Sequence, residues 1–499
     1  MEFVQNFPFF SIIISMFAGI ISSVLSGKKA RNLCVASVAT ITVLSAITLI
    51  FVMHTKEAYT YMMGHFPAPW GNEIRVGILE GVLATTFSLV LLLSVLSAYH
   101  RTAADIETTK LNLFYLLINL LMSSLLAIIY TNDLFTAYVF VEINTIAACG
   151  LIMIRQVGRT IVAAVRYMGM SLIGSGLFLI GLAMLYSMTG QLLMEPAKKV
   201  IEGIVATDAY HVPLLVTLVF MSIGLAVKSG LYPFHSWMPD AYSYSTSSAS
   251  AVLSGLVSKA YIILLIKILC RVFGREFFIH SHLTNILFVF GLVGMIMGSV
   301  NAILEKDIRR MIAFSSVAQI GYIYMGMGLG TEAGIVAAIY HILHHAVIKA
   351  LLFTSVVGLS NVSGGSKLFP DLRGAAYRHK VAGLGFAVGS FSMVGIPMFS
   401  GFVAKYLFAT AAMHVSAKKL ALTLIVLAVS TILNAIYFIH TVVTIYTPAG
   451  NDKDFLERKW HERPWVTAGL VIFILLNFVL GLYSGPVIEL ITEGLQMFE

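Results

Sequence analysis

Long apolar stretches recur along the whole chain, and this pattern predicts an all-α membrane protein. Each stretch is about as long as the 20 or so residues that an α-helix needs to cross a bilayer. A transmembrane β-barrel would instead show alternating segments of about ten residues, and these stretches are too long and too uniformly apolar for that. The pattern predicts fourteen spanning helices, at residues 9–26, 33–53, 76–98, 111–130, 133–154, 161–187, 212–229, 245–270, 282–303, 309–329, 334–358, 382–410, 418–446 and 465–492.

The composition supports the same class of protein. Hydrophobic residues make up 58% of the chain and charged residues only 11%, whereas soluble domains carry about 25% charged residues. Such a chain cannot cover a surface that faces water, so the bilayer is its main solvent. The longest polar stretches, 188–210 and 447–464, are expected to be loops rather than a soluble domain. Residues 1–8 lack the basic start of a signal peptide.

The three cysteines carry no metal or redox signature. Cys34, Cys149 and Cys270 lie far apart in apolar stretches and form no C-x-x-C pair. This spacing argues against disulfides, iron–sulfur ligation and zinc knuckles. We expect all three to be small buried hydrophobic side chains.

The formal charge of +8 is distributed unevenly between the two predicted membrane faces. Because cytoplasmic loops carry an excess of lysine and arginine, both termini are predicted to lie outside the cytoplasm. The basic residues are not interleaved with aromatic ones as nucleic-acid binding requires, so no nucleic-acid partner is expected. The predicted cytoplasmic loops carry eighteen cations and the other loops eight: Lys28, Lys29, Arg31, Arg101, Lys110, Arg155, Arg159, Lys306, Arg309, Arg310, Lys367, Arg373, Arg378, Lys380, Lys453, Arg458, Lys459 and Arg463, against Lys56, Arg75, Lys198, Lys199, Arg271, Arg275, Lys418 and Lys419.

Two segments 171 residues apart share a pattern of glycine and serine. Residues 224–230 and 395–401 both read G-x-x-x-x-S-G, and further helix breakers and a lysine lie close to each. Spans interrupted by glycine or proline at matching places in two halves are typical of transporters built from inverted repeats. The offset of five helices, an odd number, would give the two copies opposite orientations.

Ionisable side chains lie inside several predicted spans. Glu142 lies roughly ten residues from either end of the fifth span, and Glu80 lies early in the third. An ionised group at mid-bilayer is costly unless it is hydrated or paired, so such residues are functional candidates by default. Five of them on separate helices predict a polar path across the protein: Glu142, Lys228, Lys259, Lys349 and Lys405.

Lys228 has two interpretations. Gly230 and Pro233 break the helix beside it and free backbone carbonyls that need water or polar neighbours, which indicates a hydrated cavity. Its position near a helix end also fits a lysine that snorkels to the membrane surface beside a packing kink.

Three histidines share one predicted helix with Lys349. His341, His345 and Lys349 follow each other at four-residue intervals and therefore stack on one face, with His344 beside them. Two imidazoles one turn apart could bind zinc, but the only nearby acidic residue is Glu332, expected at the start of the helix. Histidine titrates near neutral pH, so the row better suits a proton relay.

A switchable ion pair is the simplest way to drive such a relay. A carboxylate that moves toward or away from a buried lysine drives a proton on or off it. Glu142 and Lys228 are the candidate pair, Lys259 and the histidines the next positions, and Lys405 the last. This order is a hypothesis, because a sequence does not show which residues touch.

Six motifs at these residues resemble the antiporter-like membrane subunits shared by Mrp-type cation/proton antiporters, complex I and membrane-bound hydrogenases. The resemblance covers roughly residues 75–410. Among the branches the chain looks most like the D-type Mrp subunit and its hydrogenase homologues, because G-H-F-P-A-P-W-G-N-E-I-R-V at 64–76 resembles the loop of that branch and a lysine at 405 is compatible with it. The motifs are V-E-I-N around Glu142, K-S-G-x-x-P-F-H-x-W-x-P-D-A at 228–241, which includes His235, G-x-x-x-K at 255–259, D-x-K/R-R-x-x-A-x-S-S at 307–316, H-x-x-x-H-A-x-x-K-A-L-L-F at 341–353 and G-I-P-x-x-S-G-F-x-x-K at 395–405.

The resemblance implies fourteen helices and two inverted five-helix repeats. The first three helices would occupy residues 1–110, the two repeats 111–272 and 282–447, and the last helix 464–499. Some residues depart from the family pattern: Tyr242 replaces a histidine, serines replace two prolines in the following A-Y-S-Y-S-T-S-S-A-S-A stretch, Glu80 replaces an aspartate and His344 an asparagine. The lost prolines leave the break between the seventh and eighth helices open.

These features predict a subunit that moves protons, alone or in exchange for Na⁺, inside a multisubunit complex of a prokaryotic plasma membrane. The chain has no redox cofactor motif, and no cofactor or metal is expected in it. Its partners would be sister membrane subunits and, in a redox complex, a peripheral redox module. The alternatives are a stand-alone Mrp antiporter, a proton-pumping subunit of a hydrogenase or NADH dehydrogenase, and an inert scaffold; a transporter of an organic solute fits less well.

Overall fold

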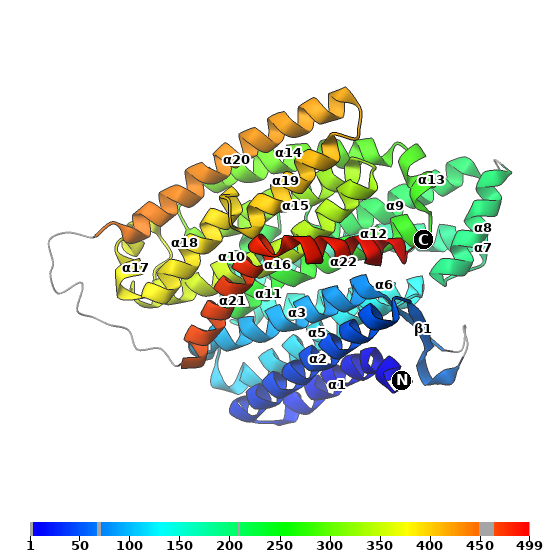
Figure 1. The fold of residues 1–499 in the computed structure, drawn as a ribbon. Coiled ribbons are helices and arrows are strands. Elements are labelled where there is room, and N and C mark those ends of the chain that lie inside the picture. The colour runs from blue at the N-terminus through cyan, green and yellow to red at the C-terminus, as the bar shows by residue number, and fades with distance from the viewer. Residues whose placement is uncertain (1–2, 67–70, 208–209, 449–463, 499) are drawn as a thin grey trace.

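The chain folds into a bundle of helices that lie roughly along one direction (Figure 1). The computed structural model describes residues 3–66, 71–207, 210–448 and 464–498. The described chain begins and ends at the same end of the bundle, which we call the termini face; the end that carries α17 (Ala375–Arg378) is the opposite face. Twelve helices of the described part are long and apolar enough to cross a membrane, so the protein is an integral membrane protein.

Twelve of the predicted stretches coincide with these helices. The eighth is one continuous helix in which a π-helical turn (Leu253–Val257) joins two α-helical parts. The spans are α1 (Phe7–Val24), α2 (Gly27–Thr55), α3 (Ile78–Ser97), α5 (Leu111–Tyr130), α6 (Leu134–Met153), α7 (Gly158–Thr189), α9 (His211–Ser229), α11 with α12 (Ser247–Val252 and Ser258–Arg271), α14 (Leu283–Leu304), α16 (Glu332–Asn361), α20 (Ala417–Tyr446) and α21 (Pro464–Leu482).

The other two predicted stretches have a different form, so the count of fourteen is not confirmed. The stretch 309–329 is α15 (Ile308–Gly328), which carries two arginines and a glutamine and is buried along almost its whole length. Because protein surrounds α15, it needs no apolar face for lipid. The stretch 382–410 is divided into α18 (Lys380–Val394) and α19 (Ser400–Ala412), with a break between them.

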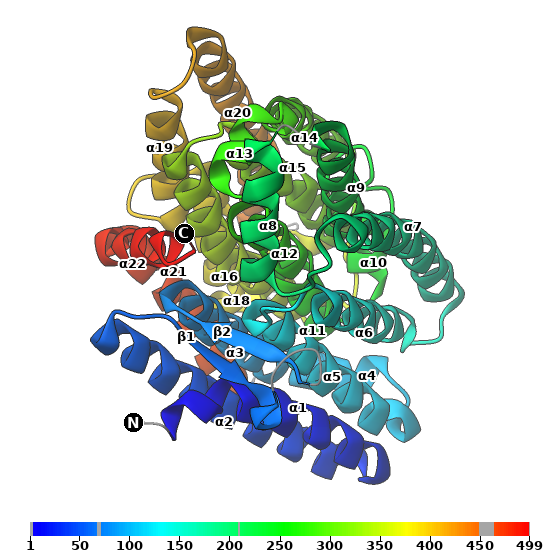
Figure 2. The same ribbon diagram turned by 90° about the vertical axis from the view of Figure 1, so that its right-hand side faces the viewer.

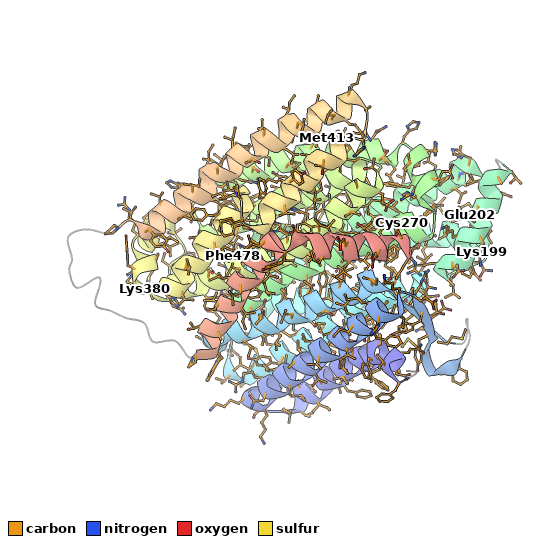
Figure 3. All side chains as sticks on the ribbon, in the orientation of Figure 1. Lys199, Glu202, Cys270, Lys380, Met413 and Phe478 are labelled. Carbon is orange, nitrogen blue, oxygen red and sulfur yellow. The ribbon has the colours of Figure 1, made fainter. Side chains whose placement is uncertain are left out.

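Short elements at the termini face were not predicted. The stretch 188–210 was expected to be a loop, but it contains α8 (Met194–Ala206), a helix too short to span that buries only Met194, Ala197 and Ile201. Strands β1 (Tyr59–Met62) and β2 (Glu73–Val76) form an antiparallel ribbon at the same face (Figure 2). Figure 3 shows Lys199 and Glu202 of α8 at this end and Lys380 at the other. The predicted loop 447–464 lies mostly outside the described residues, as do four of the eighteen cations, Lys453, Arg458, Lys459 and Arg463, and residues 67–70 of the 64–76 motif.

The remaining short helices connect the spans. The last predicted helix, 465–492, is divided into α21 and α22 (Ser484–Gln496), which meet at Tyr483. The others are α4 (Tyr99–Asp105), α10 (Met238–Tyr244) and α13 (Arg275–His280), with 3₁₀ turns at Val4–Asn6, Met63–His65, Thr108–Lys110 and Phe369–Leu372.

The most buried helices lie in the middle of the bundle. The α11–α12 helix and α16 are wholly buried along their apolar windows, and Figure 2 shows both between the α7–α9 side and the C-terminal helices. Glycine permits the closest approaches around them: a Cβ on Gly291 of α14 would lie 2.4 Å from the backbone nitrogen of Met325 in α15. Small residues at contacts of this kind are typical of membrane helices. Cys34, Cys149 and Cys270 are buried, as predicted.

Candidate functional site

The first buried charge pair joins α6 to the broken end of α9. The ammonium Nζ of Lys228 lies 3.2 Å from Oε1 of Glu142 and donates a 2.8 Å hydrogen bond to Oγ1 of Thr145. Ser175 of α7 donates a hydrogen bond to the same carboxylate. The Lys228 side chain is fully buried, and 24% of the Glu142 side chain is exposed. The snorkelling interpretation of Lys228 is therefore wrong, because the ammonium turns inward to a carboxylate.

Two glycine positions bring these groups together. Helix α9 ends because Gly230 adopts a left-handed conformation, with φ of 79°, which places Lys228 in its last turn. Helices α7 and α9 touch at Gly174 and Gly224, where a Cβ on Gly224 would lie 2.6 Å from the Gly174 carbonyl oxygen. This contact brings the neighbouring Ser175 within reach of the pair.

A chain of hydrogen bonds continues from Lys228, and sequence reasoning missed it. Oγ1 of Thr145 lies 3.5 Å from the hydroxyl of Tyr261, which donates to Oδ1 of Asn144 at 3.0 Å. Asn144 in turn donates to Ser124 of α5 at 2.8 Å. The ring of Tyr261 also faces Lys228, with Nζ 5.6 Å from its centroid. An asparagine and a tyrosine inside apolar spans were the only signal for this chain in the sequence.

Lys259 lies directly after the π-helical turn of the eighth span. Its ammonium donates to the carbonyl oxygen of Ser254 and, at 3.2 Å, to Oγ of Ser258. A π-helical turn leaves backbone carbonyls off the regular ladder, and such turns are frequent at functional sites. Within the described residues no carboxylate forms an ion pair with Lys259, whose side chain is completely buried.

The break between the seventh and eighth helices persists without the two prolines. Helix α10 ends at Tyr244, and the chain restarts at Ser247, where Oγ1 of Thr246 accepts the backbone N–H of Ala249 at 3.3 Å. Arg309 of α15 donates to the carbonyl oxygen of Ser245 at 2.8 Å. A threonine cap and a buried guanidinium therefore replace proline as the cause of the break.

The histidine row of α16 has the predicted geometry in part. The rings of His341 and His345 stack 6.0 Å apart, as the four-residue spacing predicts. Their ring nitrogens are buried and have no hydrogen-bond partner among the described residues, a situation that water usually resolves. His344 leaves the row, and its Nδ1 lies 2.7 Å from Oγ of Ser400 at the start of α19.

Lys349 joins α16 to α15, one turn beyond His345. Its buried ammonium donates to the carbonyl oxygen of Ile312 at 2.9 Å and to Oγ of Ser315. Both partners are neutral. Within the described residues, Lys349 and Lys259 therefore each hold their ammonium by hydrogen bonds alone.

Lys405 lies beside the second helix break. Its ammonium donates to the carbonyl oxygen of Val394, the last residue of α18, at 2.6 Å and to Oγ1 of Thr431 at 2.8 Å. The ring of Tyr322 lies between Lys405 and the histidine row: Nζ of Lys405 is 5.9 Å from its centroid, and the His341 ring stacks on it at 5.5 Å.

A second missed network holds this break against the C-terminal helices. Oδ1 of Asn477 in α21 accepts hydrogen bonds from Ser392 at 2.9 Å and from Ser400 at 2.6 Å. Because Ser400 also contacts His344, Asn477 connects α21 to the histidine helix. Contacts between residues 77 or more positions apart leave no trace in the sequence pattern.

The two helix breaks share a backbone motif but not the predicted alignment. Gly230 and Gly395 each have positive φ and donate to the carbonyls three and four residues before them. The shared G-x-x-x-x-S-G pattern pairs Gly230 with Gly401 instead, and Gly224 with Gly395. That pairing was wrong, because Gly224 lies inside α9 whereas Gly395 ends α18.

His235 lies apart from the row. Its ring stacks on Tyr232 at 5.0 Å and meets the edge of Phe314 at 6.4 Å. The nine predicted residues thus form no single connected network, and no direct hydrogen bond or ion pair joins Lys228, Lys259 and Lys349 to one another within the described part of the chain. That part also contains no cluster of three or more His, Cys, Asp or Glu side chains that could hold a metal ion.

Long apolar helices around buried charges define an integral membrane protein with a polar interior. Residues 131–432 match the family model described as NADH:quinone oxidoreductase/Mrp antiporter, TM. The chain therefore belongs to this family, which confirms the resemblance stated above.

Relatives with assigned names come from both branches of the family. NADH-quinone oxidoreductase subunit N of Desulforudis audaxviator is 30% identical over 447 residues, which cover 88% of this chain and 86% of that protein. The D-type subunit of the Na(+)/H(+) antiporter of Alkalihalophilus pseudofirmus is 26% identical over 428 residues, which cover 86% of this chain and 83% of that protein.

Two solved structures share the fold. A chain of the Mrp complex from Dietzia sp. superposes with a TM-score of 0.87 at 22% identity, covering 100% of this chain and 98% of that one. A chain of the membrane-bound sulfane sulfur reductase, an archaeal respiratory membrane complex, gives the same TM-score and coverage at 24% identity.

Proposed function

We propose that this chain is an ion-translocating subunit of a multisubunit membrane complex of the Mrp antiporter type. The observation that carries the proposal is the buried row of ionisable side chains across the bundle: the pair of Glu142 and Lys228, then Lys259, then Lys349 with His345 and His341, and Lys405 beyond Tyr322. Such groups are costly in a membrane and are retained where ions or protons move. Protons are the substrate, exchanged for Na⁺ if the complex is an antiporter.

The alternative function is that of a proton-pumping subunit in a redox-driven respiratory complex. Its support is the relative named NADH-quinone oxidoreductase subunit N and the fold shared with a respiratory membrane complex. In that case electrons would run in a peripheral redox module outside this chain. Purifying the complex in mild detergent and identifying the subunits that accompany the chain separates the two, because nickel–iron or iron–sulfur subunits occur only in the redox complex.

The proposal includes the surroundings of the chain. Its partners are sister membrane subunits, and its location is the plasma membrane of a prokaryotic cell with the termini face outside. The lysines and arginines concentrated at the opposite face support this orientation. Residues 111–272 and 282–447 are the two inverted repeats, and the common motif at Gly230 and Gly395 supports that assignment.

Ion exchange in proteoliposomes tests the function directly. The purified complex is reconstituted with a pH-sensitive dye inside, and the internal pH is followed after a Na⁺ pulse and after an imposed pH gradient. Lys228→Ala should abolish the dye response while the complex still assembles. An inert scaffold predicts the opposite, with full transport in the variant.

A further inference from the structure

A second buried ion pair lies at the termini face, apart from the row described above. Oε1 of Glu80, in the first turn of α3, lies 3.6 Å from Nη1 of Arg271, at the end of α12. The two side chains are only 3% and 2% exposed, whereas the carboxylate of the first pair, Glu142, is partly exposed. Neither Glu80 nor Arg271 takes part in the hydrogen bonds of the row.

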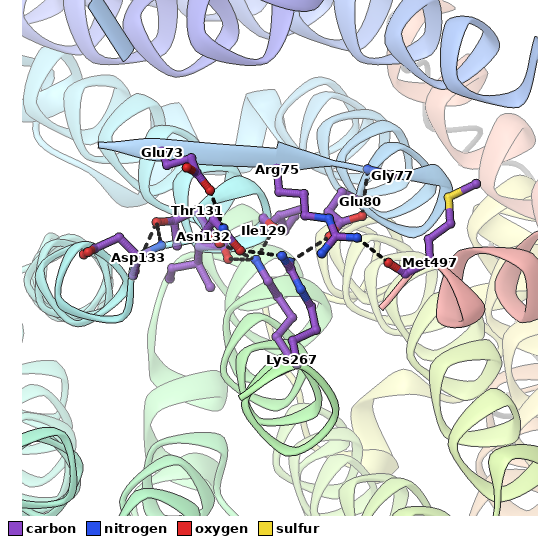
Figure 4. A network of polar contacts seen from close by, with 12 residues as sticks. Glu73, Arg75, Gly77, Glu80, Ile129, Thr131, Asn132, Asp133, Lys267 and Met497 are labelled. Atoms are coloured by element: carbon purple, nitrogen blue, oxygen red, sulfur yellow. Dashed lines mark hydrogen bonds and ion pairs between the residues drawn. The ribbon is translucent and has the colours of Figure 1, made fainter. Parts of the chain in front are cut away.

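The neighbouring Lys267 has a structural explanation, and Arg271 has one only in part. Lys267 donates hydrogen bonds of 2.7 Å to the carbonyl oxygens of Ile129 and Thr131 (Figure 4), so it caps α5 where a cation is favoured. Arg271 donates through Nη2 to Asn132, but its buried Nη1 has no hydrogen-bond acceptor among the described residues. The 3.6 Å separation from Glu80 is too long for a hydrogen bond, so the two groups form an ion pair without a direct hydrogen bond.

Arg271 also lines a cavity of about 240 Å³, which we call the vestibule. This volume has room for several water molecules. Four of its lining residues are charged side chains of α8, which lies at the termini face. The lining residues are Arg75, Glu195, Lys198, Lys199, Glu202, Arg271 and Phe498.

The C-terminal residues close one side of the vestibule. Arg75 of β2 donates a 2.6 Å hydrogen bond to the carbonyl oxygen of Met497 (Figure 4). The ring of Phe498 packs on the guanidinium of Arg271, 5.4 Å from its central carbon. Gly494 of α22 lies against the start of α3, where a Cβ would come within 2.7 Å of the Leu79 nitrogen. Two arginines of the cluster are therefore held by the last residues of the chain.

We propose that Glu80 and Arg271 form a second proton-transfer site, at which the path reaches the vestibule on the termini face. The chemistry matches that of Glu142 and Lys228: the Glu80 carboxylate binds a proton when Arg271 turns to the vestibule and releases it when the guanidinium returns. Helix α12 connects this site to the row, because Lys267 lies two turns, or about 12 Å, beyond Lys259. This inference rests on the proposed function.

The charges around Glu80 set the expected pH response. Arg271 pairs with Glu80, and the same cluster contains the positive charges of Lys267 and Arg75 and the carboxylates of Glu73 and Glu195. If Glu80 exchanges the transported proton, its removal changes the pH profile of transport as well as the rate. A purely structural role would lower the amount of assembled complex and leave the profile of the remaining transport unchanged.

Glu80→Gln in the reconstituted complex is the first test. We expect ion exchange to fall at least tenfold and the pH profile to lose one limb. Glu489→Gln, the same change on the exposed side of α22, should leave both unchanged. If Glu142→Gln blocks transport and Glu80→Gln does not, the second site is wrong and the proposed function stands. If neither blocks transport, the proposed function fails as well.

Thiol labelling of a Phe498→Cys variant tests the same proposal if the complex with Glu80→Gln does not assemble. The three native cysteines are first replaced by serine or alanine, and a membrane-impermeant thiol reagent is added from each side separately. The proposal requires labelling from the termini face and at least a fivefold loss of transport on labelling. Full labelling with unchanged transport would overturn the vestibule as part of the path, and so would an absence of labelling from that face.

Discussion

Neutralising Glu142 perturbs the only carboxylate that contacts a lysine of the row in the described structure. Glu142→Gln keeps the shape of the side chain and its bond to Ser175, and it removes the negative charge 3.2 Å from the Lys228 ammonium. Lys228 then keeps Thr145 as a hydrogen-bond partner but loses its counter-charge. The change therefore isolates the electrostatic part of the contact.

The size of the loss follows from the distance. Two unit charges 3.2 Å apart interact by about 5 kcal/mol at an effective dielectric constant of 20 and by about 1.3 kcal/mol in bulk water. Glu142 is partly exposed, so the true value lies between these limits. Because 1.4 kcal/mol is a factor of ten in an equilibrium constant, even the lower limit makes charging of Lys228 roughly tenfold less favourable. If each turnover charges Lys228, we expect transport to fall at least tenfold.

Reconstituted vesicles measure this loss, with two controls. Glu107→Gln makes the same change in an exposed ion pair with Lys110, and such pairs contribute little, so transport should be unchanged. The double variant Glu142→Gln with Lys228→Ala should transport no less than Lys228→Ala alone, because the two residues act as one unit. Near wild-type exchange by Glu142→Gln at every pH, in a fully assembled complex, would refute the reasoning.

Three further predictions follow from individual contacts. Tyr261→Phe keeps the ring beside the Lys228 ammonium but removes the hydroxyl that donates to Asn144. Ion exchange should then fall several-fold with unchanged thermal stability. Equal transport rates would show that these hydrogen bonds are not part of the proton path. Gly224→Ala places a Cβ 2.6 Å from the Gly174 carbonyl oxygen and should cost about 1–3 kcal/mol in thermal unfolding, whereas Gly176→Ala, with open space around it, should cost nothing. Burial and the nearby Arg309 guanidinium lower the pKa of Lys367, which lies in a loop, to about 7. Between about pH 7 and 10 the unfolded chain therefore binds more protons than the folded one, and the free energy of unfolding should rise with pH. Melting temperatures measured across that range should show this rise, and Lys367→Met should flatten it.

The fold was predictable wherever hydrophobicity alone decides the structure. A spanning helix needs only a long apolar stretch, and twelve of the fourteen stretches each contain one spanning helix. Helix α15 departs from that rule because neighbouring helices, and not lipid, surround it, and the α18–α19 stretch departs from it because Gly395 ends α18. Helix α8 was missed for a different reason: it is short, buries only three residues and carries four charged side chains, so it resembles a loop in a search for membrane spans.

The candidate site was predictable as a set of residues and not as a set of contacts. Charges in apolar stretches stand out, so Glu142 and the four lysines were found. Their partners are ordinary polar side chains such as Tyr261 and Asn477, brought close by helices far apart in sequence. Arg271 was assigned to a loop because it follows the last apolar residues of its span, although it is buried against Glu80.

The row contains more lysines than carboxylates, and this imbalance favours movement of one proton at a time. Within the described residues, one carboxylate, Glu142, contacts a lysine of the row, and Lys259, Lys349 and Lys405 have only neutral partners. Several uncompensated cations in one buried row repel each other over distances at which a protein interior screens poorly. Under the proposed function, a proton that arrives at one lysine would therefore favour release from the next. Proton entry through Glu142 and Lys228 would then be felt at Lys405 without a continuous chain of hydrogen bonds, which is the arrangement that the separate groups of contacts display.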